Sequence, residues 1–261
     1  MRETLAFIMK KIITDTNVWY EIGKDRNLFP VNDLIELPLP VLYELYTSRN
    51  IIISEEEFSK IQSAINAILD FKNEIHFNHL TPIDYLINIH LPNYEPSNSV
   101  KIYLDEFEAL SKLTYDECKN VKNSDERKVV SSTTEYYNKT SNDYKLEIKK
   151  IGKKNFQKWN SLPKTKQLLI SIMNSYIEFN KLELPKITKY NFENIEFFIK
   201  VFDKHLRDIA ISEEKLKDND WNDLFLMSYV EPESKFWTFE KKWIRKIKEL
   251  GLESNLVNNK G

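Results

Sequence analysis

The sequence predicts an α/β fold with a short central parallel sheet, joined to a long and mainly helical segment. Short β-branched runs alternate with amphipathic helical patterns near both ends of the chain, which is typical of a parallel sheet. Only four of the 261 residues are glycine, so tight hairpin turns are scarce. The residues between the two ends, 76–210, have mostly helical patterns interrupted by prolines.

The first elements follow from local patterns. Residues 11–15 contain Ile12 and Ile13 and predict a buried strand, after which a helix begins near Asn17. A second short strand is expected over 34–39. Pro40 then suits the first turn of a helix that carries Glu44.

A capping box formed by Ser54 and Glu57 predicts the start of an amphipathic helix that continues to about Phe71. Further helices are expected over 100–120, 142–160, 164–181 and 191–210. Near the end of the chain, Asp220 is expected to cap a helix over 220–230. A strand over 236–239 and a basic helix over 241–250 follow, and Gly251 ends that helix.

Composition excludes several classes of protein. The chain has neither a G-x-G-x-x-G nor a G-x-x-x-x-G-K-[ST] motif, so no glycine-rich loop binds a nucleotide phosphate. Cys118 is the only cysteine, which excludes an intrachain disulfide and a thiolate metal site and suits a reducing compartment. No G-x-S-x-G or H-E-x-x-H pattern is present. No apolar run approaches a membrane span, so we expect a cytoplasmic protein without a membrane partner.

Four carboxylates stand where an α/β sheet would bring them together: Asp15, Glu44, Asp223 and Glu240. Asp15 and Glu240 directly follow predicted parallel strands, and ligands of such sheets collect at the carboxyl ends of the strands. Clustered carboxylates repel one another unless a cation lies between them. Hard divalent cations with oxygen ligands, Mg²⁺ or Mn²⁺, are the cofactors that this set favours.

The same residues resemble a known family, the PIN-domain nucleases. Members carry an Asp after the first strand with Asn or Ser close behind, a Glu on an early helix, an Asp at the start of a late helix, and a final T-x-D-like strand end. These features correspond to Asp15 with Asn17, Glu44, Asp223, and Thr238 with Glu240. The resemblance covers roughly 10–72 and 215–250. It departs from the family in having Glu as the last acid and more than a hundred residues inserted between Glu44 and Asp223.

The resemblance implies a PIN-like three-layer fold, with residues 1–75 and 211–261 as the nuclease domain and 76–210 as a helical insertion. It also implies a metal-dependent endoribonuclease that leaves a 5′-phosphate and a 3′-hydroxyl, with single-stranded RNA as the favoured substrate. Asp15, Glu44, Asp223 and Glu240 would then be catalytic metal ligands. Asn17 and Thr238 would support them by hydrogen bonds, and Asp220 is an additional candidate ligand.

A basic region between Lys119 and Lys166 is the expected nucleic-acid-binding surface. It contains thirteen Lys or Arg and five Asp or Glu, whereas the whole chain has a net charge of −2. Five lysines cluster near Phe156 and Trp159, and such a set can neutralise phosphates and stack on bases. They are Lys149, Lys150, Lys153, Lys154 and Lys158. The insertion is therefore expected to be a substrate-binding cap, although the same lysines also suit an ordinary solvated helix face.

The sequence does not exclude several other functions. DNA is an alternative substrate, and a non-catalytic binding module on a degenerate PIN scaffold is an alternative of another class. A phosphatase of the haloacid-dehalogenase type would need a second Asp where Asn17 stands. A role in toxin or defence biology rests on analogy alone. An antitoxin, another regulatory protein or a second copy of the chain are the protein partners to test.

Overall fold

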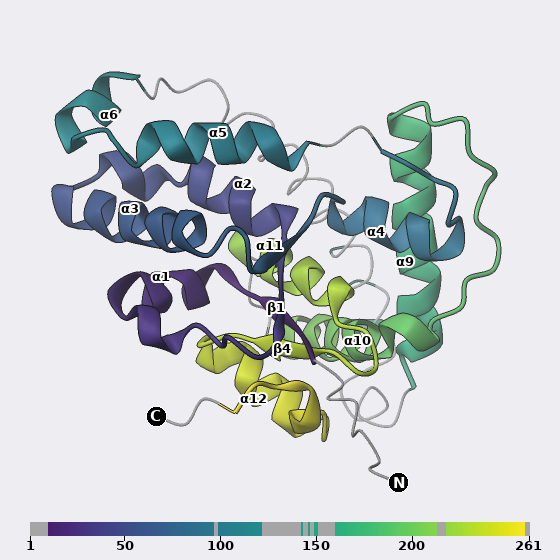
Figure 1. The fold of residues 1–261 in the computed structure, drawn as a ribbon. Helices are drawn as coiled ribbons and strands as arrows, with labels where there is room; N and C mark the ends of the chain where they lie inside the picture. Colours follow the sequence, from purple (N-terminus) through teal and green to yellow (C-terminus); the bar gives the residue numbers. More distant parts are fainter. Residues whose placement is uncertain are drawn as a thin grey trace, which may run out of the picture.

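The computed structural model describes residues 10–96, 99–121, 142, 146, 149, 150, 160–212 and 218–258. Within these residues the chain has an α/β fold with one parallel sheet of four strands in the order β3-β2-β1-β4 (Figure 1). This confirms the predicted fold class at the level of a short parallel sheet combined with many helices. None of the helices in the described ranges is both long and apolar enough to cross a membrane.

The strands are short. They are β1 Lys11–Thr14, β2 Leu34–Pro38, β3 Ile75–Asn78 and β4 Lys235–Trp237. The helices are α1 Thr16–Lys24, α2 Leu39–Thr47, α3 Glu55–Asp70, α4 Pro82–His90, α5 Val100–Leu110, α6 Tyr115–Val121, α9 Leu162–Phe179, α10 Glu196–Ser212, α11 Asp218–Leu226 and α12 Lys241–Glu249. Single 3₁₀ turns are η1 Arg26–Leu28, η2 Arg49–Ile52, η3 Glu193–Ile195, η4 Met227–Tyr229 and η5 Glu253–Asn255.

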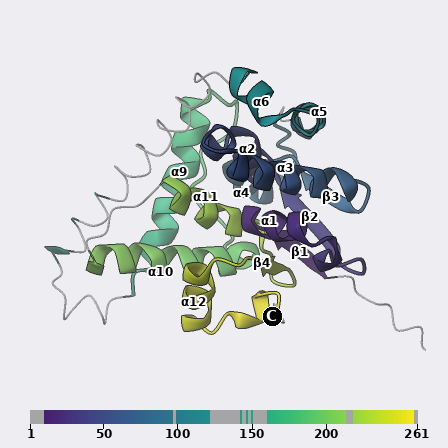
Figure 2. The same cartoon turned by 90° about the vertical axis from the view of Figure 1, so that its left-hand side faces the viewer.

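Helices pack on both faces of the sheet. The chain moves from β1 to β2 to β3 in one direction, and because crossovers between parallel strands are almost always right-handed, α1, α2 and α3 are expected on one face, where α1 packs on both α2 and α3. It then returns across the sheet to β4, so α4, α10 and α11 lie on the other face, where all three pack on η4. Figure 2 shows α5 and α6 outside α2 and α3.

Several local predictions are confirmed. Ser54 caps α3 by accepting a hydrogen bond from the Glu57 amide at 3.2 Å. Gly251 follows α12 with a φ of +68°, a conformation that glycine adopts without strain. The strands predicted over 11–15, 34–39 and 236–239 are all present, each within two residues of the expected bounds.

Three predictions were wrong. Residues 100–120 do not form one helix, because Thr114 and Glu117 cap a second helix, α6: Glu117 Oε2 accepts a hydrogen bond from the Thr114 amide at 2.9 Å. Asp220 is not the helix cap, since α11 already begins at Asp218. Strand β3 was not predicted, since the residues from His76 onward were expected to be mostly helical, and it spans the proposed boundary at residue 76. The division into nuclease domain and insertion stays a prediction.

Helix α1 approaches α3 very closely at Gly23. A Cβ atom there would lie 2.9 Å from the backbone nitrogen of Ala64 and 2.9 Å from the carbonyl carbon of Ser63. Arg26 fastens the same contact, since its guanidinium donates to the carbonyls of Gly23 at 2.7 Å and Ser63 at 3.3 Å. This contact fixes the axis of α1, the helix that begins directly after Asp15.

Replacing Gly23 by Ala is therefore expected to destabilise the protein. Alanine gains about 1 kcal/mol of helix propensity over glycine, but overpacking against rigid backbone typically costs about 1–3 kcal/mol and outweighs this gain. A net loss of about 1 kcal/mol would lower the melting temperature by about 2–4 °C in a chain of this size. Ser59→Ala, at an exposed position of α3, is the control and should not lower it. A Gly23→Ala variant as stable as wild type would contradict the close contact.

Candidate active site

Asp15 lies at the carboxyl end of β1, where the order of the strands reverses. Strands β2 and β3 lie on one side of β1 and β4 lies on the other, so the crevice between β1 and β4 is the usual ligand site of such a sheet. The Asp15 side chain is 2 % exposed. Its Oδ1 accepts a hydrogen bond from the Thr16 amide at 2.6 Å, and its Oδ2 accepts one from the Thr238 hydroxyl at 2.7 Å.

Asn17 and Thr238 hold the two strand ends together around Asp15. The Asn17 amide nitrogen donates to Asp15 Oδ2 at 2.5 Å, and its carbonyl oxygen accepts from the Phe239 backbone at 2.9 Å. The Glu240 backbone donates to the Thr238 hydroxyl at 3.1 Å. The hydrogen bonds expected of Asn17 and Thr238 are thus made, and they join segments that are more than 200 residues apart in sequence.

Glu44 and Asp223 reach the same place from helices. Glu44 is half-buried on α2, and its Oε2 accepts a hydrogen bond from the Thr16 hydroxyl at 2.7 Å. Asp223 is half-buried on α11, and its Oδ2 accepts from the indole nitrogen of Trp243 at 3.1 Å. Glu240 is exposed and lies between β4 and α12. Exposure to solvent therefore differs among the four acids: Asp15 is buried, Glu44 and Asp223 are half-buried, and Glu240 is exposed.

Burial and mutual repulsion perturb these acids. Burial raises the pKa of Asp15 to about 7, and the charges of Glu44 and Glu240 add to this rise. Burial also raises the pKa of Asp223 well above its ordinary value, with repulsion from Asp15 as the next cause. The pKa of Glu44 is raised by burial and by Glu240. Charge repulsion thus links Asp15 with Glu44 and Glu240, and Asp223 with all three, but that the four acids share one ion stays a prediction.

In the part of the chain that the structure describes, no positive side chain pairs with the acid cluster, by which we mean Asp15, Glu44, Asp223 and Glu240. Among the described residues, no lysine or arginine forms an ion pair with any of the four. Their oxygens are hard donors, which suit Mg²⁺ or Mn²⁺. In the described part of the chain, however, no three His, Cys, Asp or Glu side chains are close enough to hold one ion directly.

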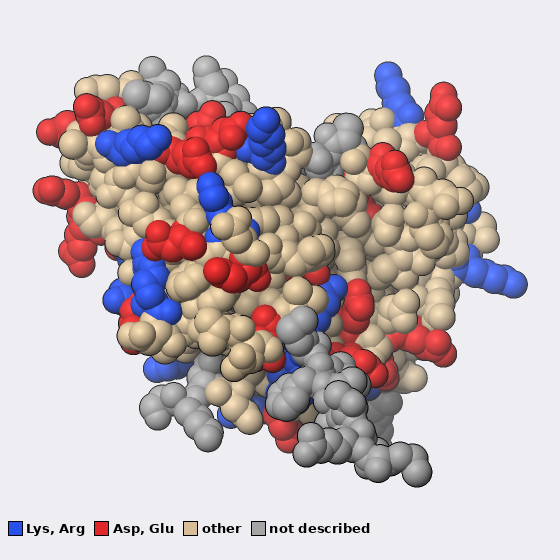
Figure 3. Space-filling view, viewed as in Figure 1, with Lys and Arg blue, Asp and Glu red and all other residues tan. Residues whose placement is uncertain are grey.

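The remaining predicted residues lie elsewhere or outside the described residues. Asp220 forms an ion pair with Lys242 on α12. Lys149 and Lys150 are exposed, whereas Lys153, Lys154 and Lys158 fall outside the described residues, as do Phe156 and Trp159. Figure 3 shows acidic and basic side chains interspersed over the face seen in Figure 1, and the predicted RNA-binding surface stays a prediction.

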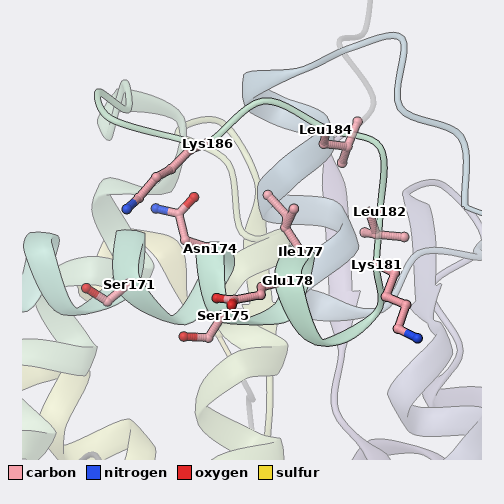
Figure 4. Close-up of a pocket in the computed structure, with 9 residues that line it drawn as sticks. All are labelled: Ser171, Asn174, Ser175, Ile177, Glu178, Lys181, Leu182, Leu184 and Lys186. Carbon is pink, nitrogen blue, oxygen red and sulfur yellow. The ribbon is translucent and has the colours of Figure 1, made fainter.

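A separate pocket of about 400 Å³ lies against α9, away from the acid cluster (Figure 4). It is lined by Ser171, Asn174, Ser175, Ile177, Glu178, Lys181, Leu182, Leu184 and Lys186. Asn174 closes it by bonding both backbone groups of Ile187, each at 2.8 Å. None of the four acids lines this pocket, so it does not contribute to the candidate site.

Comparison with known protein families, curated proteins and solved structures gave no match. The assignment of the site therefore depends on its geometry and on the resemblance in its residues.

Sequence reasoning missed two residues that hold the acids. Thr16 binds both Asp15, through its amide, and Glu44, through its hydroxyl. The first contact could have been expected from the position of Asp15 before a helix. Trp243 binds Asp223, but in the sequence it belongs to the apolar stripe of an amphipathic helix. Such a position normally indicates core packing, so no local signal distinguished it.

The metal-free protein is expected to lose stability as the pH rises from about 4 to about 7. Aspartate in the unfolded chain has a pKa near its ordinary value of 3.8, whereas folded Asp15 has a pKa of about 7. Between these values the folded chain binds more protons than the unfolded chain, so raising the pH favours unfolding. The raised pKa values of Asp223 and Glu44 act in the same direction. Melting temperatures measured in EDTA across this range test the expectation.

Asp15→Asn should flatten this pH dependence, because the amide does not titrate. Asp116→Asn, at an exposed position on α6, should leave it unchanged. Added Mn²⁺ should raise the melting temperature more at neutral pH than at acid pH, since the ion competes with protons for the carboxylates. Equal slopes for wild type and Asp15→Asn would show that Asp15 does not carry the raised pKa.

Proposed function

We propose that this chain is a PIN-like, Mg²⁺- or Mn²⁺-dependent endoribonuclease with Asp15, Glu44, Asp223 and Glu240 as its metal-binding acids. The observation that supports it most strongly is an acid cluster beside the ends of β1 and β4 that raises the pKa of its own members and pairs with no lysine or arginine among the described residues. Holding several repelling carboxylates together costs stability, and this cost is recovered when a divalent cation binds. A structural salt-bridge network would instead have placed lysine or arginine among them.

In such a site the carboxylates would bind the ion, and neighbouring polar side chains would orient the carboxylates. Asp15 and Glu240 would bind the first ion, directly or through water, while Glu44 and Asp223 would complete its shell or hold a second ion. Mg²⁺ commonly keeps several of its waters in proteins, which suits acids that do not meet tightly enough to enclose an ion by themselves. When bound, the ion would activate a water and neutralise the charge that develops on the leaving oxygen. Thr16, Asn17 and Thr238 keep the carboxylates oriented.

Hydrolysis of single-stranded RNA to a 5′-phosphate and a 3′-hydroxyl is the reaction proposed, with DNA as the alternative substrate. Lys149 and Lys150 belong to the proposed RNA-binding surface on the insertion. A non-catalytic binding module is the second candidate, and the absence of a close three-acid group among the described residues favours it. A toxin or defence role, with an inhibitor or activator as partner, stays a proposal by analogy.

A cleavage assay separates these candidates. Labelled single-stranded RNA and DNA are incubated with wild type in Mg²⁺, Mn²⁺ or EDTA, and with Asp15→Asn and Asp223→Asn. We expect cleavage of RNA that EDTA abolishes and that each substitution lowers by about 100-fold or more, as is typical when a preorganised charged group is lost. Asp116→Asn is the matched control and should cleave like wild type.

Two results would contradict the nuclease proposal. The first is cleavage that persists in Asp15→Asn, which would indicate a contaminating enzyme. The second is the absence of both cleavage and Asp15-dependent Mn²⁺ binding in wild type, which would favour the non-catalytic module.

A further inference from the structure

Trp243 ties α12 to α11 at the acid cluster. Its indole nitrogen donates to Asp223 Oδ2 at 3.1 Å, and its side chain is fully buried. The hydrogen bond occupies Oδ2, while Asp223 Oδ1 accepts no hydrogen bond from the described residues. One oxygen of Asp223 is thus fixed by a hydrogen bond, and no described residue bonds the other.

Neighbouring side chains hold the Trp243 ring in place. The ring of His205 on α10 packs against it with centroids 5.0 Å apart, and the ammonium of Lys242 lies 4.7 Å from its centre. Burial, with the charges of Lys246 and Lys242, lowers the pKa of His205 to about 3, so its ring is neutral at physiological pH. Lys242 also pairs with Asp220 on α11, which anchors the helix that carries Asp223.

Ion pairs dock α12 itself on α10. Lys246, only 5 % exposed, pairs with Asp208. Asp208 also pairs with Lys204 at 2.6 Å, and Lys204 pairs with Glu249 at 3.0 Å. These contacts join the two helices along their length, so the position of Trp243 relative to the sheet is set by more than its own packing.

We propose that Trp243 is a positioning residue that orients Asp223 for metal binding, an inference that rests on the nuclease function proposed above. A neutral N–H donor suits this task better than a lysine or arginine would. It fixes the carboxylate without adding a positive charge that would repel the ion. The Trp243 ring is fully buried, so the position of its N–H relative to the half-buried Asp223 is set by packing.

Trp243→Phe tests this role, with Trp237→Phe as the matched control. Both substitutions remove an indole N–H from a buried ring, but the Trp237 nitrogen has no hydrogen-bond partner among the described residues. Mn²⁺ binding to EDTA-treated and dialysed full-length protein is measured by isothermal titration calorimetry. We expect binding about 10- to 100-fold weaker in Trp243→Phe, the usual effect of losing a group that orients a metal ligand. Trp237→Phe should bind like wild type.

Kinetics distinguish orientation from a general loss of structure. In Trp243→Phe, raising the Mn²⁺ concentration should restore kcat toward the wild-type value with the KM for RNA unchanged. A misfolded site would not recover in this way. If Trp243→Phe does not fold, Trp243→Met, whose flexible apolar side chain adapts to an irregular cavity and also lacks an N–H donor, provides the same test.

The outcomes separate this inference from the proposed function. Wild-type Mn²⁺ affinity in Trp243→Phe, or equal weakening in both tryptophan variants, would overturn the positioning role and leave the nuclease proposal standing. If wild type shows no Mn²⁺ binding that depends on Asp15, the nuclease proposal falls and the role of Trp243 falls with it.

Discussion

The structure around the candidate site depends on keeping mutually repelling carboxylates together, and no lysine or arginine of the described ranges pairs with them. Burial makes this more costly, because charge is least stable where water is excluded, and the raised pKa of Asp15 is the direct consequence. The protein offsets part of the cost with neutral donors. Thr16, Thr238 and Trp243 each donate to a carboxylate oxygen and bring no charge of their own. The negative potential is thereby preserved, as a site for a divalent cation requires.

The scaffold that supports these donors comes from both ends of the chain. The first end supplies β1, α1 and α2, with the close packing of α1 on α3 at Gly23 as its anchor. The last end supplies α11, β4 and α12, which the ion pairs around Asp208 fasten to α10. The two halves meet where Thr238 and Asn17 bond across the adjacent ends of β1 and β4. A loosened contact in either half would therefore move carboxylates relative to one another without touching them.

Some elements of this arrangement could be predicted from the sequence, and others could not. The strand ends at Asp15 and Glu240 were predictable, because parallel strands place their carboxyl ends on one edge and both runs are apolar. Strand β3 was not, since it is a four-residue strand at the edge of the sheet and His76 on it is exposed. Helix α6 was missed although the Thr114–Glu117 capping box was visible in the sequence. Contacts of Trp243 depend on how α12 docks on α11, which no local pattern specifies.

The packing also bears on the role of the long middle segment. Helix α10 lies within the predicted insertion, yet it contacts α11, α12 and η4 and supplies Asp208 to the ion pairs that dock α12. Strand β3, at the start of the same segment, completes the sheet beside β2. A detachable cap would leave the sheet and the acid-bearing helices intact when removed, whereas loss of α10 would remove the support of Trp243 and hence of Asp223. Helix α10 therefore supports the site through its contacts with α11 and α12, independently of what the other helices of the segment bind.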